Sequence, residues 1–151
     1  MRVVIQRVRE ASVTINEALY SQIGYGYLLL VGISNTDDEQ IVRAMAEKVL
    51  FLRICDDENH KMNRSIQDIG GQILSVSQFT LYADARKGRR PSFTDAGEPQ
   101  KAKELYEYFN KCLAESGLTV KSGVFQEEMA VGLVNDGPVT ILLDSDIILK
   151  K

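Results

Sequence analysis

The chain has 151 residues and a net charge of −3, with 44% hydrophobic and 26% charged residues. This length and composition predict one globular domain over residues 1–151 and exclude a disordered chain. No apolar run approaches the ~20 residues of a membrane span, and the first residues enter a strand pattern instead of a signal peptide, so we expect a cytoplasmic protein without a membrane partner. The negative charge argues against a protein that coats nucleic acids without specificity.

The first third of the chain predicts strands followed by a helix. Residues 2–15 alternate between apolar and polar positions, as in a strand, and Arg7 falls on a mostly apolar face. Asn16–Glu17 favour a hairpin turn, and residues 23–33 are too apolar for a surface strand, which predicts a central strand. Capping side chains then precede an amphipathic helix over residues 37–52.

Polar side chains gather where the next strand ends. Residues 72–82 begin with strand-like alternation, which Ser77, Gln78 and Thr80 then break. The only histidine, His60, precedes this strand in a polar stretch that we expect to be a solvated loop.

The segment 83–97 has no regular periodicity and carries a cluster of cations. The cluster consists of Arg86, Lys87, Arg89 and Arg90. A solvated loop and a loop that contacts phosphates are equally consistent with this pattern. Loops of this length in compact domains are often functional.

The last third of the chain predicts one more helix and further strands. Pro99 opens a helix with a single apolar stripe, which ends near Gly117. Strands follow near residues 119–125, 129–135 and 139–149. The order β-β-β-α-β-α-β-β-β favours a mixed α/β fold, with mainly antiparallel or mixed β-sheets and two main helices packed outside, over a doubly wound parallel sheet.

Pro138 interrupts strand-like sequence within Asn135–Thr140. A proline at such a point removes a donor from the hydrogen-bond ladder. Local composition favours a tight turn that joins two strands, because Asn-Asp-Gly-Pro is ordinary turn chemistry. The alternative is a cis peptide that displays backbone groups to a ligand, although only about 5–6% of such bonds are cis in folded proteins.

The sequence lacks the usual groups for acid-base or metal catalysis. Ser77 as a nucleophile would need a base, and His60 is the one histidine available. Cys55 and Cys112 share no CxxC spacing, so we expect buried thiols, no disulfide, no metal and no cofactor. A serine esterase that uses Ser77 and His60 stays an alternative, and so does a non-enzymatic RNA-binding dimer that uses the basic cluster.

Two motifs resemble the signatures of a known family. Ser77–Leu81 and Asn135–Thr140 closely resemble the motifs of the D-aminoacyl-tRNA deacylases of the bacterial (DTD) type. Residues 1–8 and 88–93 are similar as well, so the resemblance covers essentially the whole chain. It implies a barrel-like, DTD-like fold and an enzyme that hydrolyses the ester bond of D-aminoacyl-tRNA and of mischarged glycyl-tRNA.

The resemblance also implies how the substrate is bound. It implies a homodimer with tRNA as partner and with sites at the subunit interface, where a cis Gly137–Pro138 peptide of one subunit enters the site of the other. The backbone carbonyls of this peptide would exclude an L side chain, whereas D-aminoacyl and glycyl esters fit. Hydrolysis would rely on the 2′-hydroxyl of the terminal adenosine and on backbone N–H groups.

These expectations assign roles to three sets of residues. The catalytic pocket for the terminal adenosine and the ester would consist of Ser77, Gln78, Phe79 and Thr80. Chiral selection would belong to Gly137, Pro138, Val139 and Thr140, with Arg7 bracing the turn. If the basic loop contacts phosphates, the tRNA contacts would come from Arg86, Lys87, Arg89 and Arg90.

Overall fold

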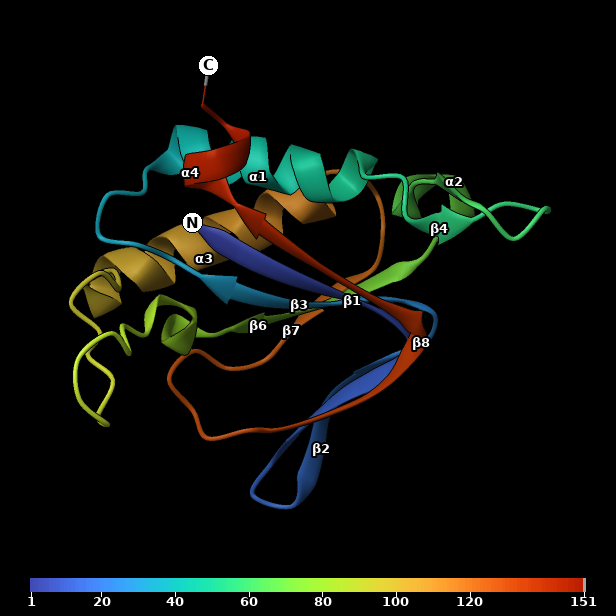
Figure 1. Cartoon of the computed structure of the whole chain (residues 1–151). Coiled ribbons are helices and arrows are strands. Elements are labelled where there is room, and N and C mark those ends of the chain that lie inside the picture. Colours follow the sequence, from blue (N-terminus) through green and yellow to red (C-terminus); the bar gives the residue numbers. More distant parts are fainter. Residues whose placement is uncertain (151) are drawn as a thin grey trace.

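A computed structural model describes residues 1–150, and its centre is a mixed six-stranded sheet (Figure 1). The strands are β1 (Arg2–Ile15), β2 (Ala18–Ile23), β3 (Gly26–Gly32), β6 (Gln72–Ser77), β7 (Val120–Ser122) and β8 (Ala130–Asp144). They run in the order β2-β1-β3-β6-β7, with β8 also paired to β1. β1 pairs antiparallel with β2, β3 and β8, whereas β3–β6 and β6–β7 are parallel pairs.

Two long helices cover one side of this sheet. α1 (Glu39–Phe51) and α3 (Pro99–Ala114) lie on the same side in Figure 1 and contact each other. The remaining elements are the hairpin β4 (Cys55–Asp56) and β5 (Met62–Arg64), α2 (Ile66–Ile69), the 3-10 turn η1 (Phe79–Tyr82) and α4 (Ser145–Ile148). The sheet curls into a nearly closed, barrel-like form, which confirms the predicted mixed α/β fold with two main helices outside. Among residues 1–150, no helix has the length and apolar character needed to cross a membrane.

The central strand β3 is buried on both faces. Leu29 belongs to the larger core cluster, together with Phe109 of α3. Leu28 belongs to a second cluster, together with Leu74 of β6. Because successive side chains of a strand point to opposite faces, a strand that is buried on both sides is apolar throughout. The prediction of a central strand is confirmed, with a later start at Gly26.

β8 is one continuous strand, where the sequence predicts two strands joined by a turn. β1 pairs with it on both sides of the proline, since Gln6 lies opposite Thr140 and Val8 lies opposite Asn135. The residues in between bulge out of the ladder, and the chain keeps its direction. The interpretation as a tight turn that joins two strands is therefore wrong, because ladder pairing on both flanks outweighs the local turn preference.

Other boundaries also differ from the sequence prediction. The strand within residues 72–82 ends at Ser77, where the alternation breaks, and the η1 turn that follows it was not predicted. The strand expected to reach residue 149 ends at Asp144, whose side chain accepts a hydrogen bond from the N–H of Asp146 and caps α4. The β4–β5 hairpin and α2 were not predicted, because the polar stretch around His60 has no apolar period.

The two cysteines are placed as expected. Cys55 and Cys112 are both buried, and neither forms a disulfide. The thiol of Cys55 lies 3.5 Å from the hydroxyl oxygen of Tyr27. Burial raises the pKa of Cys55, so this thiol is held in its protonated form.

Candidate functional site

A cleft of about 950 Å³ opens where β6 ends. Its walls include Ser77, Gln78 and Phe79, and Phe93 of the following loop lies among them. β3 and β6 run parallel, with Val31 opposite Ser77, so the cleft lies beyond the carboxyl ends of two neighbouring strands. Ligands commonly bind at such an edge of a sheet.

The polar motif at this edge leaves two backbone N–H groups without an acceptor in the part of the chain that the structure describes. The N–H of Gln78 donates to the carbonyl of Val31 at 2.7 Å, and the Gln78 side chain donates to the hydroxyl of Thr80. The next N–H groups, those of Phe79 and Thr80, have no acceptor among residues 1–150. Unpaired N–H groups at the start of a helical turn can bind an anionic oxygen.

The structure brings three of the four predicted pocket residues into the cleft wall. Ser77, Gln78 and Phe79 line the cleft, whereas Thr80 contacts it only through the side chain of Gln78. Phe79 is 58% exposed, and its ring meets the ring of Phe93 edge to face, with centroids 5.0 Å apart. The exposed Phe79 beside the half-buried Phe93 offers a flat surface on which a base or an aromatic side chain can stack.

The basic cluster sits on a hairpin-like loop that leads into Phe93. Asp84 and Ser92 close this loop with two backbone hydrogen bonds of 2.8 and 3.0 Å. Arg86 forms a bidentate ion pair with the carboxylate of Asp84, with N–O distances of 2.9 and 2.7 Å. This pair lowers the pKa of Asp84 to about 2. The cations of the loop without such a pair among residues 1–150 are Lys87, Arg89 and Arg90, all exposed.

The second motif forms a bulge on β8 that is closed by its own side chains. The peptide bond between Gly137 and Pro138 is cis, as expected, and Gly137 has a φ of 123°. The side chain of Asn135 spans the bulge, because its Oδ1 accepts from the N–H of Val139 at 2.9 Å. This side chain therefore replaces the ladder partner that the bulge removes.

The hydroxyl of Thr140 takes part in the same closure. Thr140 donates to the side-chain oxygen of Gln6 at 2.6 Å, and the amide of Asn135 donates to that same oxygen. Gln6 was not among the predicted site residues. The alternating pattern of residues 2–15 places Gln6 on one face of the strand with Val4 and Val8, but it does not identify the partners of Gln6 on β8.

Arg7 lies buried directly against the bulge. Its side chain is 5% exposed, and a Cβ atom added to Gly137 would lie 3.0 Å from its Nη2. Nε of Arg7 lies 3.2 Å from the backbone oxygen of Asp136, and Nη1 donates to the carbonyl of Ile54 at 2.8 Å and to Asp56 at 3.0 Å. Burial acts to lower the pKa of Arg7, but Tyr25 and the two carboxylates raise it overall.

The structure does not bring the two motifs together within one chain. Arg7 pairs with Tyr27, which lies opposite Ile73, whereas Ser77 is level with Val31 at the other end of β3. From strand rise and spacing, the bulge on β8 lies about 20 Å from the cleft. Each chain thus has both a cleft and a bulge, but the two do not meet within the same chain.

His60 also lies away from Ser77. It occupies the turn of the β4–β5 hairpin, which Asp56 ties to Arg7 at the bulge end of the sheet. Ser77 and His60 form no hydrogen bond within the part of the chain that the structure describes. Residues 1–150 also contain no group of three or more histidine, cysteine or acidic side chains placed to hold a metal.

Comparisons with known proteins agree on one family. A family model described as D-Tyr-tRNA(Tyr) deacylase matches residues 4–144. A D-aminoacyl-tRNA deacylase from Exiguobacterium sp. is 56% identical over 146 residues, which cover 97% of this chain and 99% of the relative. Another, from Listeria monocytogenes serotype 4a, is 54% identical over 151 residues and covers 100% of both chains.

Two solved structures share the fold. One is described as a c-Myc DNA unwinding element binding protein, with a TM-score of 0.90 and 40% identity over 95% of this chain and 98% of the other. The other is described as a probable eukaryotic D-amino acid tRNA deacylase, with a TM-score of 0.83 over 94% of this chain and 97% of the other. At 18% identity, this second likeness shows the fold alone.

Proposed function

The chain belongs to the family of D-aminoacyl-tRNA deacylases, and we propose that it hydrolyses the ester bond of D-aminoacyl-tRNA to release the free D-amino acid and tRNA. The observation that carries this proposal is the match to relatives of that name along nearly the whole chain, both motifs included. Mischarged glycyl-tRNA is the second proposed substrate, because glycine has no side chain to exclude. The proposed place of action is the cytoplasm.

The direct test of this function compares two enantiomers of one substrate. The protein is incubated with D-tyrosyl-tRNA and with L-tyrosyl-tRNA, and the surviving ester is measured over time. Selective loss of the D-ester supports the proposal. Survival of both esters in spite of tRNA binding would indicate a non-enzymatic RNA-binding dimer, and cleavage of small esters without tRNA would indicate a serine esterase.

A homodimer would unite the two motifs that one chain keeps apart. Among the described strands, β8 pairs only with β1, so its other edge is open to a partner. The exposed apolar side chains on this strand include Leu133, Val134 and Leu142, the last 63% exposed. An open strand edge with apolar side chains is a surface that a second copy can cover. We propose that the bulge of each subunit enters the cleft of the other.

The bulge would then act as a wall that selects D-esters. Gly137 has no side chain and Pro138 has only an apolar ring, so backbone groups are the only polar groups that these two residues can offer to a bound substrate. A fixed backbone wall beside the α-carbon rejects the L side chain by contact, without a pocket fitted to each D side chain. Broad tolerance for different D-amino acids follows from this arrangement. Val139 closes the bulge through the side chain of Asn135, and Thr140 ties it to its ladder partner Gln6.

The proposed chemistry uses positioning and backbone donors. Water attacks the ester carbonyl, and the unpaired N–H groups of Phe79 and Thr80 stabilise the oxyanion of the tetrahedral intermediate. The 2′-hydroxyl of the terminal adenosine assists proton transfer. Ser77 and the side chain of Gln78 orient the substrate.

A substrate with a 2′-deoxy terminal adenosine tests this chemistry. We expect its turnover to fall at least ~100-fold, within the usual range for loss of a general acid or base. Ser77→Ala should retain measurable activity on normal D-tyrosyl-tRNA, since Ser77 only orients the substrate. Normal cleavage of the 2′-deoxy ester would contradict the role of the RNA hydroxyl. Complete loss of activity in Ser77→Ala, with unchanged tRNA binding, would favour a serine nucleophile.

The basic loop is proposed to contact the tRNA backbone, and its cations are not equivalent. Because Arg86 is already paired with Asp84, we expect Arg89 and Arg90 to supply the phosphate contacts. The variant Arg89→Ala/Arg90→Ala should weaken tRNA binding and lower the slope of log K against log salt by about 0.7–0.9 per lost contact. The control Arg86→Ala should leave the slope nearly unchanged. Equal slopes for both variants would overturn this assignment.

A further inference from the structure

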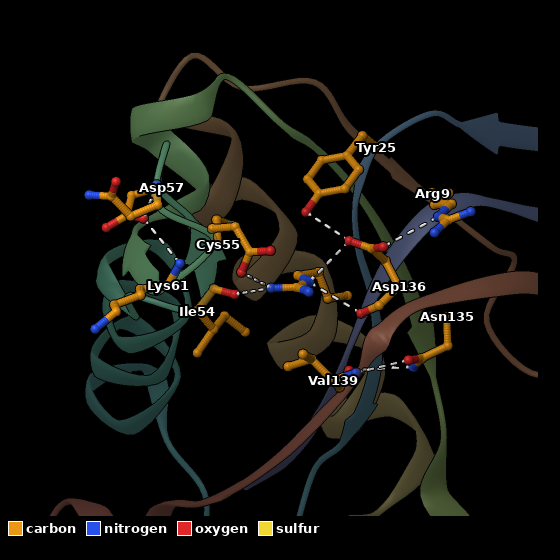
Figure 2. Close-up of polar contacts among 12 residues, drawn as sticks. Arg9, Tyr25, Ile54, Cys55, Asp57, Lys61, Asn135, Asp136 and Val139 are labelled. Atoms are coloured by element: carbon orange, nitrogen blue, oxygen red, sulfur yellow. Dashed lines mark hydrogen bonds and ion pairs between the residues drawn. The ribbon is translucent and has the colours of Figure 1, made fainter.

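The carboxylate of Asp136 is shared by donors from three different positions of the chain. Its Oδ2 lies 3.1 Å from the hydroxyl of Tyr25 and 3.3 Å from Nε of Arg7, and its Oδ1 lies 3.3 Å from Nε of Arg9. Figure 2 shows Asp136 between Tyr25 and Arg9, with its side chain turned toward the guanidinium in the centre of the view. The side chain of Asp136 is only 18% exposed. A partly buried carboxylate with three donors is held far more firmly than a surface ion pair.

This network fixes the backbone of Asp136, the residue that leads into the proposed Gly137–Pro138 wall. Asp136 immediately precedes Gly137, and its backbone oxygen also accepts from Nε of Arg7. The guanidinium is itself anchored on the carbonyl of Ile54 and on Asp56. Side chain and backbone of one residue are therefore tied to the same buried cation, which fixes the direction of the chain as it reaches Gly137. At the other end of the bulge, the Asn135 side chain holds the N–H of Val139.

Tyr25 connects the bulge to a second part of the sheet. It lies in the turn between β2 and β3, and its ring is rigid apart from two side-chain torsions. Burial and the hydrogen bond to Asp136 raise the pKa of Tyr25 to about 12, so its hydroxyl stays protonated at neutral pH and can donate. The bulge is thus attached to the neighbouring hairpin as well as to its own ladder partner.

We propose that Asp136 and Tyr25 are positioning residues that hold the Gly137–Pro138 wall in place and so set how strictly L-aminoacyl esters are rejected. The inference rests on the proposed function. A steric wall discriminates between enantiomers only if it is rigid. The free-energy penalty for binding an L-ester cannot exceed the free energy needed to displace the wall. Removing its supports should therefore admit L-esters before it reduces binding of D-esters.

The test measures chiral selectivity in isosteric variants. In Asp136→Asn and Tyr25→Phe, kcat/KM is determined separately for D-tyrosyl-tRNA and L-tyrosyl-tRNA. We expect the D-to-L ratio to fall about ten-fold in Asp136→Asn and about three-fold in Tyr25→Phe, in line with the loss of charged and of neutral hydrogen bonds. The activity on the D-ester should stay within about three-fold of wild type. The double variant should lose less than the product of the two effects, because both side chains belong to one network.

The controls carry the same chemical changes elsewhere on the surface. Tyr20→Phe removes a hydroxyl from β2, where Tyr20 is 55% exposed, and Glu107→Gln removes an exposed charge from α3. Both should keep the wild-type ratio. An unchanged D-to-L ratio in Asp136→Asn and Tyr25→Phe, with a selective wild-type enzyme, would overturn the inference alone. A wild-type protein that does not prefer the D-ester would overturn the proposed function together with it.

Discussion

Replacing Arg7 with methionine is expected to lower the free energy of unfolding by about 3 kcal/mol, the low end for removal of one partner from a buried ion pair. Arg7 is the buried cation on which two carboxylates and two backbone carbonyls converge, and methionine offers none of them a donor. The carboxylate of Asp136 would lose its buried partner, and the carbonyl of Ile54 would lose a hydrogen bond. Urea unfolding at neutral pH measures the effect.

The matched control for this variant is Arg9→Met. Arg9 pairs with the same carboxylate at the same distance of 3.3 Å as Arg7, but its side chain is 72% exposed. We expect its replacement to change the free energy of unfolding by less than ~0.5 kcal/mol, as for other exposed ion pairs. Equal destabilisation by the two variants would mean that burial of Arg7 does not determine its contribution.

The second large effect is expected for Gly137→Ala. An added Cβ would lie 2.8 Å from Cγ2 of Val139 and 3.0 Å from Nη2 of Arg7, and the φ of 123° is disfavoured for alanine. The bulge must therefore shift, and with it the proposed wall. We expect kcat/KM for D-tyrosyl-tRNA to fall at least ~10-fold, since a displacement of site groups by about 1 Å can lower the rate even more.

Gly117→Ala is the matched control for the glycine variant. Gly117 also has a positive φ, of 85°, but an added Cβ meets nothing within 4 Å. This control carries a backbone penalty without the collision, so it should reduce stability slightly and leave kcat/KM unchanged. Activity losses of the same size in both variants would show that global stability, and not the position of the bulge, is responsible.

The parts of the fold that depend on periodic patterns could be predicted from the sequence. β1 and α3 have clear periods of two and about three and a half residues, and both are found where expected. The run that forms β3 is apolar throughout because both its faces are buried. In each case the apolar pattern of a single segment is sufficient to predict the element, because it shows which faces of that segment are buried in the core.

The support of the bulge could not be predicted in this way. Asp136, Tyr25 and Arg7 are far apart in the sequence and meet only because β1 pairs with both β3 and β8. The local sequence around Pro138 favours a turn, and only the ladder on both flanks keeps β8 in one direction. Strand register, which a single segment does not encode, therefore decides which polar groups become partners.

The separation of the two motifs within one chain could not be predicted from the sequence either. Ser77 ends β6, whereas Gly137 lies in the middle of β8 and level with the start of β3, at a distance of about 20 Å by strand geometry. The resemblance to the deacylases implies a site made by two subunits, and the geometry of one chain gives a physical reason for that arrangement. No single subunit can close its own cleft with its own bulge unless the sheet unfolds.

A mixed dimer tests this central claim most directly. One subunit carries Gly137→Ala, which damages the bulge, and the other carries Gln78→Ala/Phe79→Ala, which damages the cleft. With different tags, the mixed dimer is purified, and the loss of D-tyrosyl ester is measured beside both parent dimers. A site shared between subunits pairs the intact cleft of one with the intact bulge of the other, so the mixed dimer should recover about half of the wild-type activity by symmetry. A mixed dimer as inactive as its parents would contradict the shared site.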